Sequence, residues 1–246
     1  LVNNTAQRME CETLYWKDKT ITLTNRNYDE VFGKELDDIN KYDPVDHKDA
    51  YAREHMLEYA HRTIEQTRKV VKELCGKNKI TSERYVMNKP KQLLHDIIGR
   101  IDYETNKLFI ELKTKPPSIV KKKGKDEYYF KTQPLGDDAV FDAYWGQVAF
   151  YWKCTGKKPF LVLVNDKEYL IYDDTHAALY DDHLEYQYNM MVKRIYNWEQ
   201  MIIYCKGDLQ KLADISEPPD LNHFYHYKFL TDKQRKTIKQ LWGLDA

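Results

Sequence analysis

The spacing of apolar and polar residues divides the chain into helices and strands. Residues 49–74 contain neither Gly nor Pro and repeat apolar side chains at three and four positions, which predicts a long helix ending near Gly76. Short β-prone runs separated by polar or Pro-containing turns then predict an antiparallel meander at residues 83–87, 93–102 and 107–114. Further along, the same patterns predict a helix at 139–156, strands at 159–165 and 168–173, and a long helix at 177–205.

The two ends of the chain carry weaker patterns. The pattern of residues 1–48 predicts an irregular N-terminal segment with one or two short strands. Within the C-terminal extension, residues 206–246, Thr231 and Gln234 form a capping-box pattern that opens a final helix through Trp242. We therefore expect one domain of the α/β (α+β) class, whose mixed central sheet is flanked by helices and whose core lies at residues 49–205.

Composition narrows the class of protein. With 246 residues, 42% hydrophobic and 32% charged, and no run near the roughly 18 apolar residues of a membrane helix, we expect one globular domain and no membrane span. The 39 basic and 39 acidic residues cancel, so nucleic-acid affinity requires local clustering of charge. The four cysteines lack the close spacing of zinc or iron–sulfur sites, and we expect reduced core thiols.

One hairpin carries candidate chemistry, in the sequence GRIDYETNKLFIELKTK at residues 99–115. Side chains alternate along a strand, so Glu111 and Lys113 share one face. Asp102 precedes the turn, and closing the hairpin brings its carboxylate toward that strand. Two carboxylates bind a hard cation such as Mg²⁺, and an adjacent lysine orients or deprotonates an attacking water, as phosphodiester hydrolysis requires. The alternative interpretation of Glu111 and Lys113 alone is an exposed ion pair.

Two separate motifs together point to a known family. IIGRID followed by FIELKT resembles the G-x-x-D and E-x-K elements of the PD-(D/E)XK nuclease superfamily. Gln147 and Tyr151 in GQVAFY match the Q-x-x-x-Y signature of its RecB-type exonuclease branch, which includes phage and mitochondrial exonucleases. The order of predicted elements also resembles that branch over residues 50–205.

This resemblance implies a restriction-endonuclease-like core that binds one or two Mg²⁺ or Mn²⁺ ions. It implies metal ligation by Asp102, Glu111 and the backbone carbonyl of Leu112, with Lys113 as the catalytic lysine. Gln147 and Tyr151, one helical turn apart, would orient the site or contact a DNA strand end. The alternative for these two residues is an ordinary helix face.

The resemblance also implies a His or Glu metal ligand on the upstream helix, within the pattern G-x-x-x-H-x-x-x-E. His61 and Glu65 have the H-x-x-x-E spacing, which places both side chains on one helix face. Leu57 stands where the family has Gly, so the alternatives His47, His55 and Glu58 stay open. His95, just ahead of the hairpin, is interpreted as a strand-edge residue.

Residues 113–134 form a basic segment, with seven lysines against two acids and a local charge of +5. Its Pro and Gly residues predict an irregular loop. Lysines in it would neutralise backbone phosphates, namely Lys115, Lys121, Lys122, Lys123 and Lys125. Tyr128 and Tyr129, followed by Phe130, would stack on unpaired bases. A solvated loop without a ligand is the alternative.

The resemblance therefore predicts a metal-dependent DNA exonuclease acting on single strands or strand ends. Two alternatives stay open: a structure-specific endonuclease or nickase of the same fold, and a catalytically silent nucleic-acid-binding module. DNA is the expected partner, and no sequence feature supports a replication or recombination protein as another. Because the chain starts at Leu1 and shows no signal segment, we expect a processed or trimmed start and a soluble intracellular protein, in a bacterial or phage-host cytoplasm or an organelle matrix.

Overall fold

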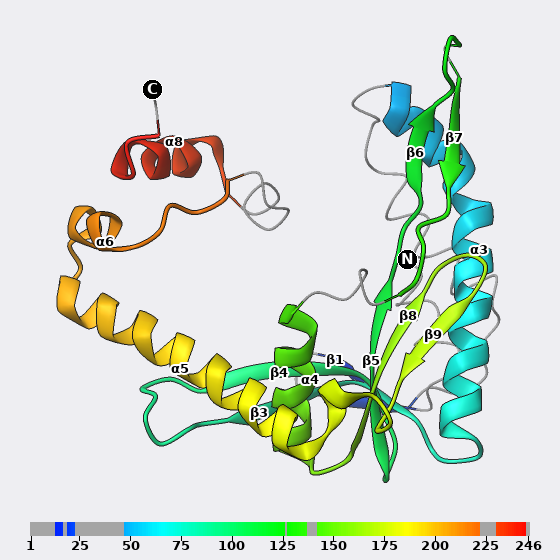
Figure 1. Cartoon of the computed structure of the whole chain (residues 1–246), viewed down its shortest axis with the longest axis horizontal. Coiled ribbons are helices and arrows are strands. Elements are labelled where there is room, and N and C mark those ends of the chain that lie inside the picture. The colour runs from blue at the N-terminus through cyan, green and yellow to red at the C-terminus, as the bar shows by residue number, and fades with distance from the viewer. Residues whose placement is uncertain are drawn as a thin grey trace. The chain divides into compact units, whose positions relative to one another are not determined.

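The computed structural model describes residues 13–16, 19–22, 47–125, 127–136, 142–221 and 230–244 (Figure 1). The chain divides into two compact units. The first comprises residues 1–88 and 96–189, and the second comprises residues 89–95 and 190–246. All of the candidate site residues named above lie in the first unit.

A mixed β-sheet forms the centre of the first unit. Among the described residues it has seven strands: β1 (Thr13–Trp16), β2 (Lys19–Thr22), β3 (Thr81–Asn88), β4 (Ile97–Glu104), β5 (Leu108–Thr114), β8 (Lys158–Val164) and β9 (Tyr169–Tyr172). Their order is β2-β1-β3-β4-β5-β8-β9. Strands β3, β4 and β5 pair antiparallel, which confirms the predicted meander, while β8 pairs parallel to β5 and antiparallel to β9.

Helix α3 (His47–Cys75) covers one face of this sheet. Near its C-terminal end, Val71 and Cys75 pack in the buried core with Ile110 and Leu112 of β5. Its length and end match the prediction, because Gly76 follows it with a φ of +57°, a left-handed conformation that suits Gly in a helix C-cap.

Helix α4 (Asp142–Thr155) packs against β3, β4 and β8. Its Tyr151 meets Phe109 of β5 edge to face, with ring centroids 6.0 Å apart. Phe109 alternates with Ile110, which faces α3, so the two helices cover opposite faces of the sheet. The helix ends as predicted at Gly156, which has a φ of +64°.

Residues 118–131 contain a two-stranded ribbon, where the sequence predicted an irregular loop. Strands β6 (Ser118–Lys121) and β7 (Tyr128–Lys131) pair antiparallel, and Figure 1 shows them beside the N-terminal part of α3. The loop prediction is wrong here because the strands gain an aromatic surface to pack on. Phe130 lies 5.4 Å from Tyr51 of α3, measured between ring centroids.

Helices make up most of the second unit. Helix α5 (Asp181–Cys205) begins in the first unit and ends in the second, and a short 3₁₀ turn, η2 (Ala177–Leu179), precedes it where one continuous helix was predicted. The second unit also contains α6 (Leu209–Ile215), which the sequence did not predict, and α8 (Asp232–Leu241). The predicted capping box of Thr231 and Gln234 is present at the start of α8.

Within the second unit, His95 has a structural role. Glu199 of α5 accepts hydrogen bonds from the backbone N–H groups of Leu94 and His95, and also contacts the His95 ring at 2.9 Å. One carboxylate thus holds the segment just before β4, consistent with the interpretation of His95 as a strand-edge residue.

None of the helices in the described part of the chain is long and apolar enough to cross a membrane. The described cysteines, Cys75, Cys154 and Cys205, are free thiols, as expected, and two of them are buried. Cys11 lies outside the described residues.

Candidate active site

Two neighbouring strands supply the acidic groups of the site. Their ladder includes the pair Tyr103 and Ile110. One residue further on, the carboxylate of Asp102 in β4 accepts a hydrogen bond from the backbone N–H of Leu112 in β5, at 2.8 Å. Glu111 lies beside Leu112, so the hairpin brings both carboxylates to one place, as the sequence predicted.

Glu111 and Lys113 form a buried ion pair on the face that α4 covers. Lys113 Nζ lies 2.5 Å from Glu111 Oε1, and Glu111 is only 1% exposed. Lys113 is about one fifth exposed, with 22% of its side chain accessible, so the interpretation as an exposed surface pair does not hold.

Burial perturbs the charges of these groups. It raises the pKa of Glu111 well above its usual value, and the nearby Asp102 carboxylate raises it further. Burial also raises the pKa of Asp102 to about 6, although the Leu112 N–H and the Lys113 ammonium act in the opposite direction. Burial opposes the charge of Lys113, yet the Glu111 carboxylate raises the net pKa of that lysine. Without a bound cation, two acids therefore share one ammonium.

Gln147 and Tyr151 of α4 connect directly to this pair. Lys113 Nζ donates to Gln147 Oε1 at 2.9 Å, and Gln147 Nε2 donates to the Tyr151 hydroxyl at 2.9 Å. The hydroxyl donates to the backbone carbonyl of Arg100 at 2.8 Å and accepts from the Arg100 N–H at 3.1 Å. A continuous chain of hydrogen bonds thus runs from the lysine through the helix to β4.

Gly99 of β4 allows α4 to approach this closely. A Cβ atom at position 99 would lie 2.5 Å from Tyr151 Cε1 and 2.8 Å from Phe150 Cε1, both far inside van der Waals contact. The glycine of the GRID sequence is therefore required by the packing of the helix on the strand.

The acceptors at this site fit a hard divalent cation. Glu111 Oε2 is buried and has no hydrogen-bond partner among the described residues, so a bound cation would give this oxygen a partner and favour the ionised carboxylate. With Asp102 and the Leu112 carbonyl this makes a small set of oxygen donors. Mg²⁺ is commonly bound by one or two carboxylates, with water and substrate phosphate completing its shell.

The upstream helix does not complete a larger ligand set. Across the described ranges, no three His, Cys, Asp or Glu side chains come together as metal ligands. Glu65 is 63% exposed and pairs with Arg68, and Glu58 is 82% exposed and pairs with Arg62. His61 is half-buried on the same helix. The structure therefore does not bring Glu65 or Glu58 to the two carboxylates, and no group of three includes His61, His47 or His55.

The two tyrosines predicted to stack on bases lie on opposite faces of the ribbon β6–β7. Tyr128 packs against Tyr51 of α3, with ring centroids 6.0 Å apart. Tyr129 lies on the other face of the ribbon and is 39% exposed. The four lysines at the end of the ribbon are exposed: Lys121, Lys122, Lys123 and Lys125. Tyr129 and these lysines are placed to meet a ligand in solution, and Lys122 also pairs with Glu127 at 2.7 Å. Tyr128, in contrast, is a packing residue.

Two further residues contact the site and were missed by the sequence analysis. The Tyr144 ring lies 4.8 Å from Lys113 Nζ. Its position three residues before Gln147, on the same helix face, was a usable signal. The Glu83 carboxylate raises the pKa of Asp102 and pairs with Arg100. Its proximity depends on the strand register, which no local pattern in the sequence reveals.

Comparisons of the chain with protein-family models, with curated proteins and with solved structures give no match.

Proposed function

We propose that this protein is a metal-dependent DNA exonuclease with a restriction-endonuclease-like core, which hydrolyses phosphodiester bonds at strand ends or in single strands. The observation that carries the proposal is the contact between Lys113 and Gln147. It joins the E-x-K strand to the Q-x-x-x-Y helix, two motifs that the resemblance assigns to a single catalytic site.

Asp102, Glu111 and the Leu112 carbonyl would hold Mg²⁺ or Mn²⁺. A bound ion would supply Lewis-acid stabilisation of the phosphate and a water of lowered pKa. The residues of the chain have distinct tasks around it. Lys113, held by Glu111 and Gln147, carries a positive charge next to the carboxylates, where it orients the attacking water and stabilises negative charge developing on the phosphate oxygens.

Gln147 and Tyr151 are positioning residues in this scheme. Gln147 accepts from Lys113 and limits the ammonium to a small volume, and Tyr151 limits Gln147 through a hydroxyl fixed on the Arg100 backbone. Holding a catalytic group in place before the reaction lowers the entropic cost of reaching the transition state.

A digestion time course tests the proposal. Single- and double-stranded DNA, labelled at either end, is incubated with Mg²⁺ or with EDTA, and closed circular single strands are included. We expect Mg²⁺-dependent shortening of linear DNA only. Cutting of circles would instead support the endonuclease, and DNA that is bound but never shortened would support the silent binding module.

Lys113→Ala should abolish cleavage and leave DNA binding largely unchanged, because the lysine acts on the reacting groups. Lys107→Ala is the matched control, since Lys107 is exposed and precedes the opposite end of the same strand. Near-normal turnover in the Lys113 variant would remove the catalytic assignment.

A further inference from the structure

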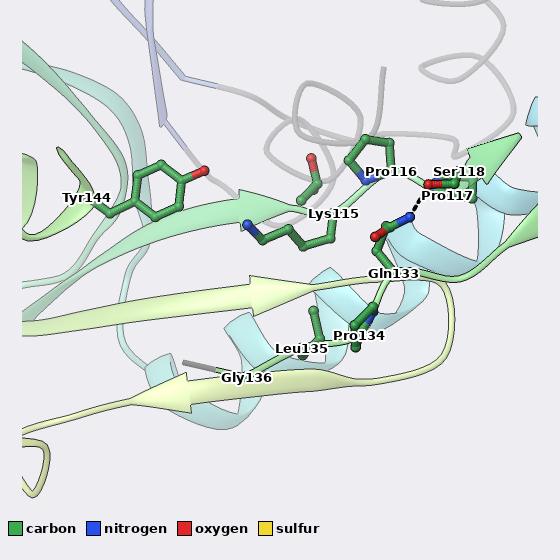
Figure 2. Close-up of a pocket in the computed structure, with 10 residues that line it drawn as sticks. Lys115, Pro116, Pro117, Ser118, Gln133, Pro134, Leu135, Gly136 and Tyr144 are labelled. Carbon is green, nitrogen blue, oxygen red and sulfur yellow. Dashed lines mark hydrogen bonds between the residues drawn. The ribbon is translucent and has the colours of Figure 1, made fainter. Parts of the chain in front are cut away.

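A hollow of about 630 Å³ opens where β5 ends, in the size range of about 300–1,000 Å³ that is usual for ligand pockets. Figure 2 shows the residues that line it. The apolar part of its surface comes from Pro116, Pro117, Pro134, Leu135 and Tyr144. The polar part includes Lys115, Ser118 and Gln133.

The walls of the hollow are fixed to the rest of the unit by hydrogen bonds. The Lys115 N–H donates to the Val164 carbonyl at 2.8 Å, and the Tyr59 hydroxyl donates to the Lys115 carbonyl at 2.5 Å. On the second segment that lines the hollow, the Asn165 side chain donates to the Gln133 carbonyl at 2.9 Å. Because these segments are tied in place before any ligand arrives, binding here would require little ordering of the walls.

Two lysine ammonium groups lie beside the aromatic ring that lines the hollow. The Tyr144 ring centroid lies 4.8 Å from Lys113 Nζ and 5.4 Å from Lys115 Nζ. In Figure 2 the Lys115 side chain extends toward Tyr144, while the two adjacent prolines lie on the other side of the lysine. A ring beside ammonium groups favours a ligand that joins a flat aromatic part to an anionic part. A lone phosphate would not use the proline and leucine wall, and a neutral apolar ligand would not use the lysines.

We infer that this hollow binds the terminal nucleotide of a DNA strand, with its base against Tyr144 and its phosphate toward Lys115. The inference rests on the proposed function, and Lys113 links the two, because the same ammonium contacts both the Glu111 carboxylate and the Tyr144 ring. On this inference the free end of the strand lies against Pro116 and Pro117, which line the hollow.

Equilibrium binding in EDTA tests this without cleavage. The full chain is titrated calorimetrically with the octanucleotide dT8 and with two analogues that lack the base of the 5′- or the 3′-terminal nucleotide. We expect one of the two analogues to bind about tenfold more weakly, the effect of losing a single base–aromatic stack. Which analogue is weakened identifies the end that enters the hollow.

Variants of Tyr144 then locate the effect. In Tyr144→Ala the difference between dT8 and the weaker analogue should disappear, because base and ring act as a pair, whereas Tyr144→Phe should keep it. Tyr186→Ala removes an exposed tyrosine of α5, outside the proposed site, and should also keep the difference. Equal binding of all three oligonucleotides by the unmodified protein, no measurable binding of dT8, or an undiminished difference in Tyr144→Ala overturns the inference.

Cleavage of dT8 with Mg²⁺, measured in parallel, separates this inference from the proposed function. Cleavage without discrimination at the ends overturns the terminal-nucleotide pocket and leaves the exonuclease proposal in place. End discrimination without Mg²⁺-dependent cleavage supports the pocket and overturns the exonuclease proposal.

Discussion

Replacing Asp102 by Asn should make the metal-free protein more stable at neutral pH while abolishing its cleavage activity. Asn has nearly the same shape, and its carbonyl oxygen keeps the acceptor for the Leu112 N–H. The variant removes only the negative charge. That charge lies next to the buried Glu111 and, without a cation, is unfavourable for folding.

The magnitude follows from the pKa of Asp102. Burial raises this pKa from 3.8 to about 6 in the folded protein. Below pH 3.8 the carboxyl is protonated in both the folded and the unfolded state, so it costs no stability. As the pH rises toward 6, the unfolded chain ionises first and folding stability is lost. At about 1.36 kcal/mol per pKa unit, the loss above pH 6 is at most about 3 kcal/mol, and residual contact with solvent reduces it.

Urea unfolding in EDTA at pH 4, 5.5 and 7.5 measures this difference. Relative to the unmodified protein, Asp102→Asn should be near equal in stability at pH 4 and more stable by about 1–3 kcal/mol at pH 7.5. Added Mg²⁺ should stabilise the unmodified protein and leave the variant unchanged. Glu54→Gln, at a side chain that is 78% exposed, is the control and should show no such pH dependence. The argument would be refuted if the difference in unfolding free energy between variant and parent were no larger at pH 7.5 than at pH 4.

Two other variants test the packing of the site and the charge of the ribbon. Gly99→Ala should lower the free energy of unfolding by about 1–3 kcal/mol and slow cleavage, because the new Cβ would displace the Tyr151 ring. Gly146→Ala on α4, where a Cβ meets no atom within 4 Å, is the control, and equal effects at the two glycines would contradict the packing argument. Replacing the exposed Lys123 and Lys125 by Ala together should reduce the slope of log affinity for single-stranded DNA against log salt by about 1.4. An unchanged slope would mean that the ribbon does not contact phosphates.

The periodicity of the chain was sufficient to predict much of the first unit. Side chains alternate along β5, so the sequence correctly placed Glu111 and Lys113 on one face of the sheet and Leu112 on the other. In the structure, Leu112 faces α3, and Lys113 faces α4. The helix ends were also predictable, since Gly76 and Gly156 both adopt the left-handed conformation that the C-cap requires.

Other features depend on contacts that local patterns do not contain. The ribbon forms because Phe130 and Tyr128 pack on Tyr51, which is far away in sequence, so the lysines and glycine of its turn gave the wrong signal. The spacing of His61 and Glu65 predicts that they share a helix face, but it does not say which face of α3 packs on the sheet. The carboxylate of Glu65 is exposed to solvent.

The glycine of GRID and the tyrosine of QVAFY are parts of one packing arrangement. Without a side chain at Gly99, the Tyr151 ring comes close enough for its hydroxyl to bond both the N–H and the carbonyl of Arg100. That hydroxyl also accepts from Gln147, which in turn holds Lys113. A larger residue at position 99 would push away the tyrosine and, with it, the glutamine that places the lysine. The two motifs, almost fifty residues apart, are therefore informative only together. The strand without the helix leaves the lysine held by Glu111 alone, and the helix without the glycine does not fit the strand.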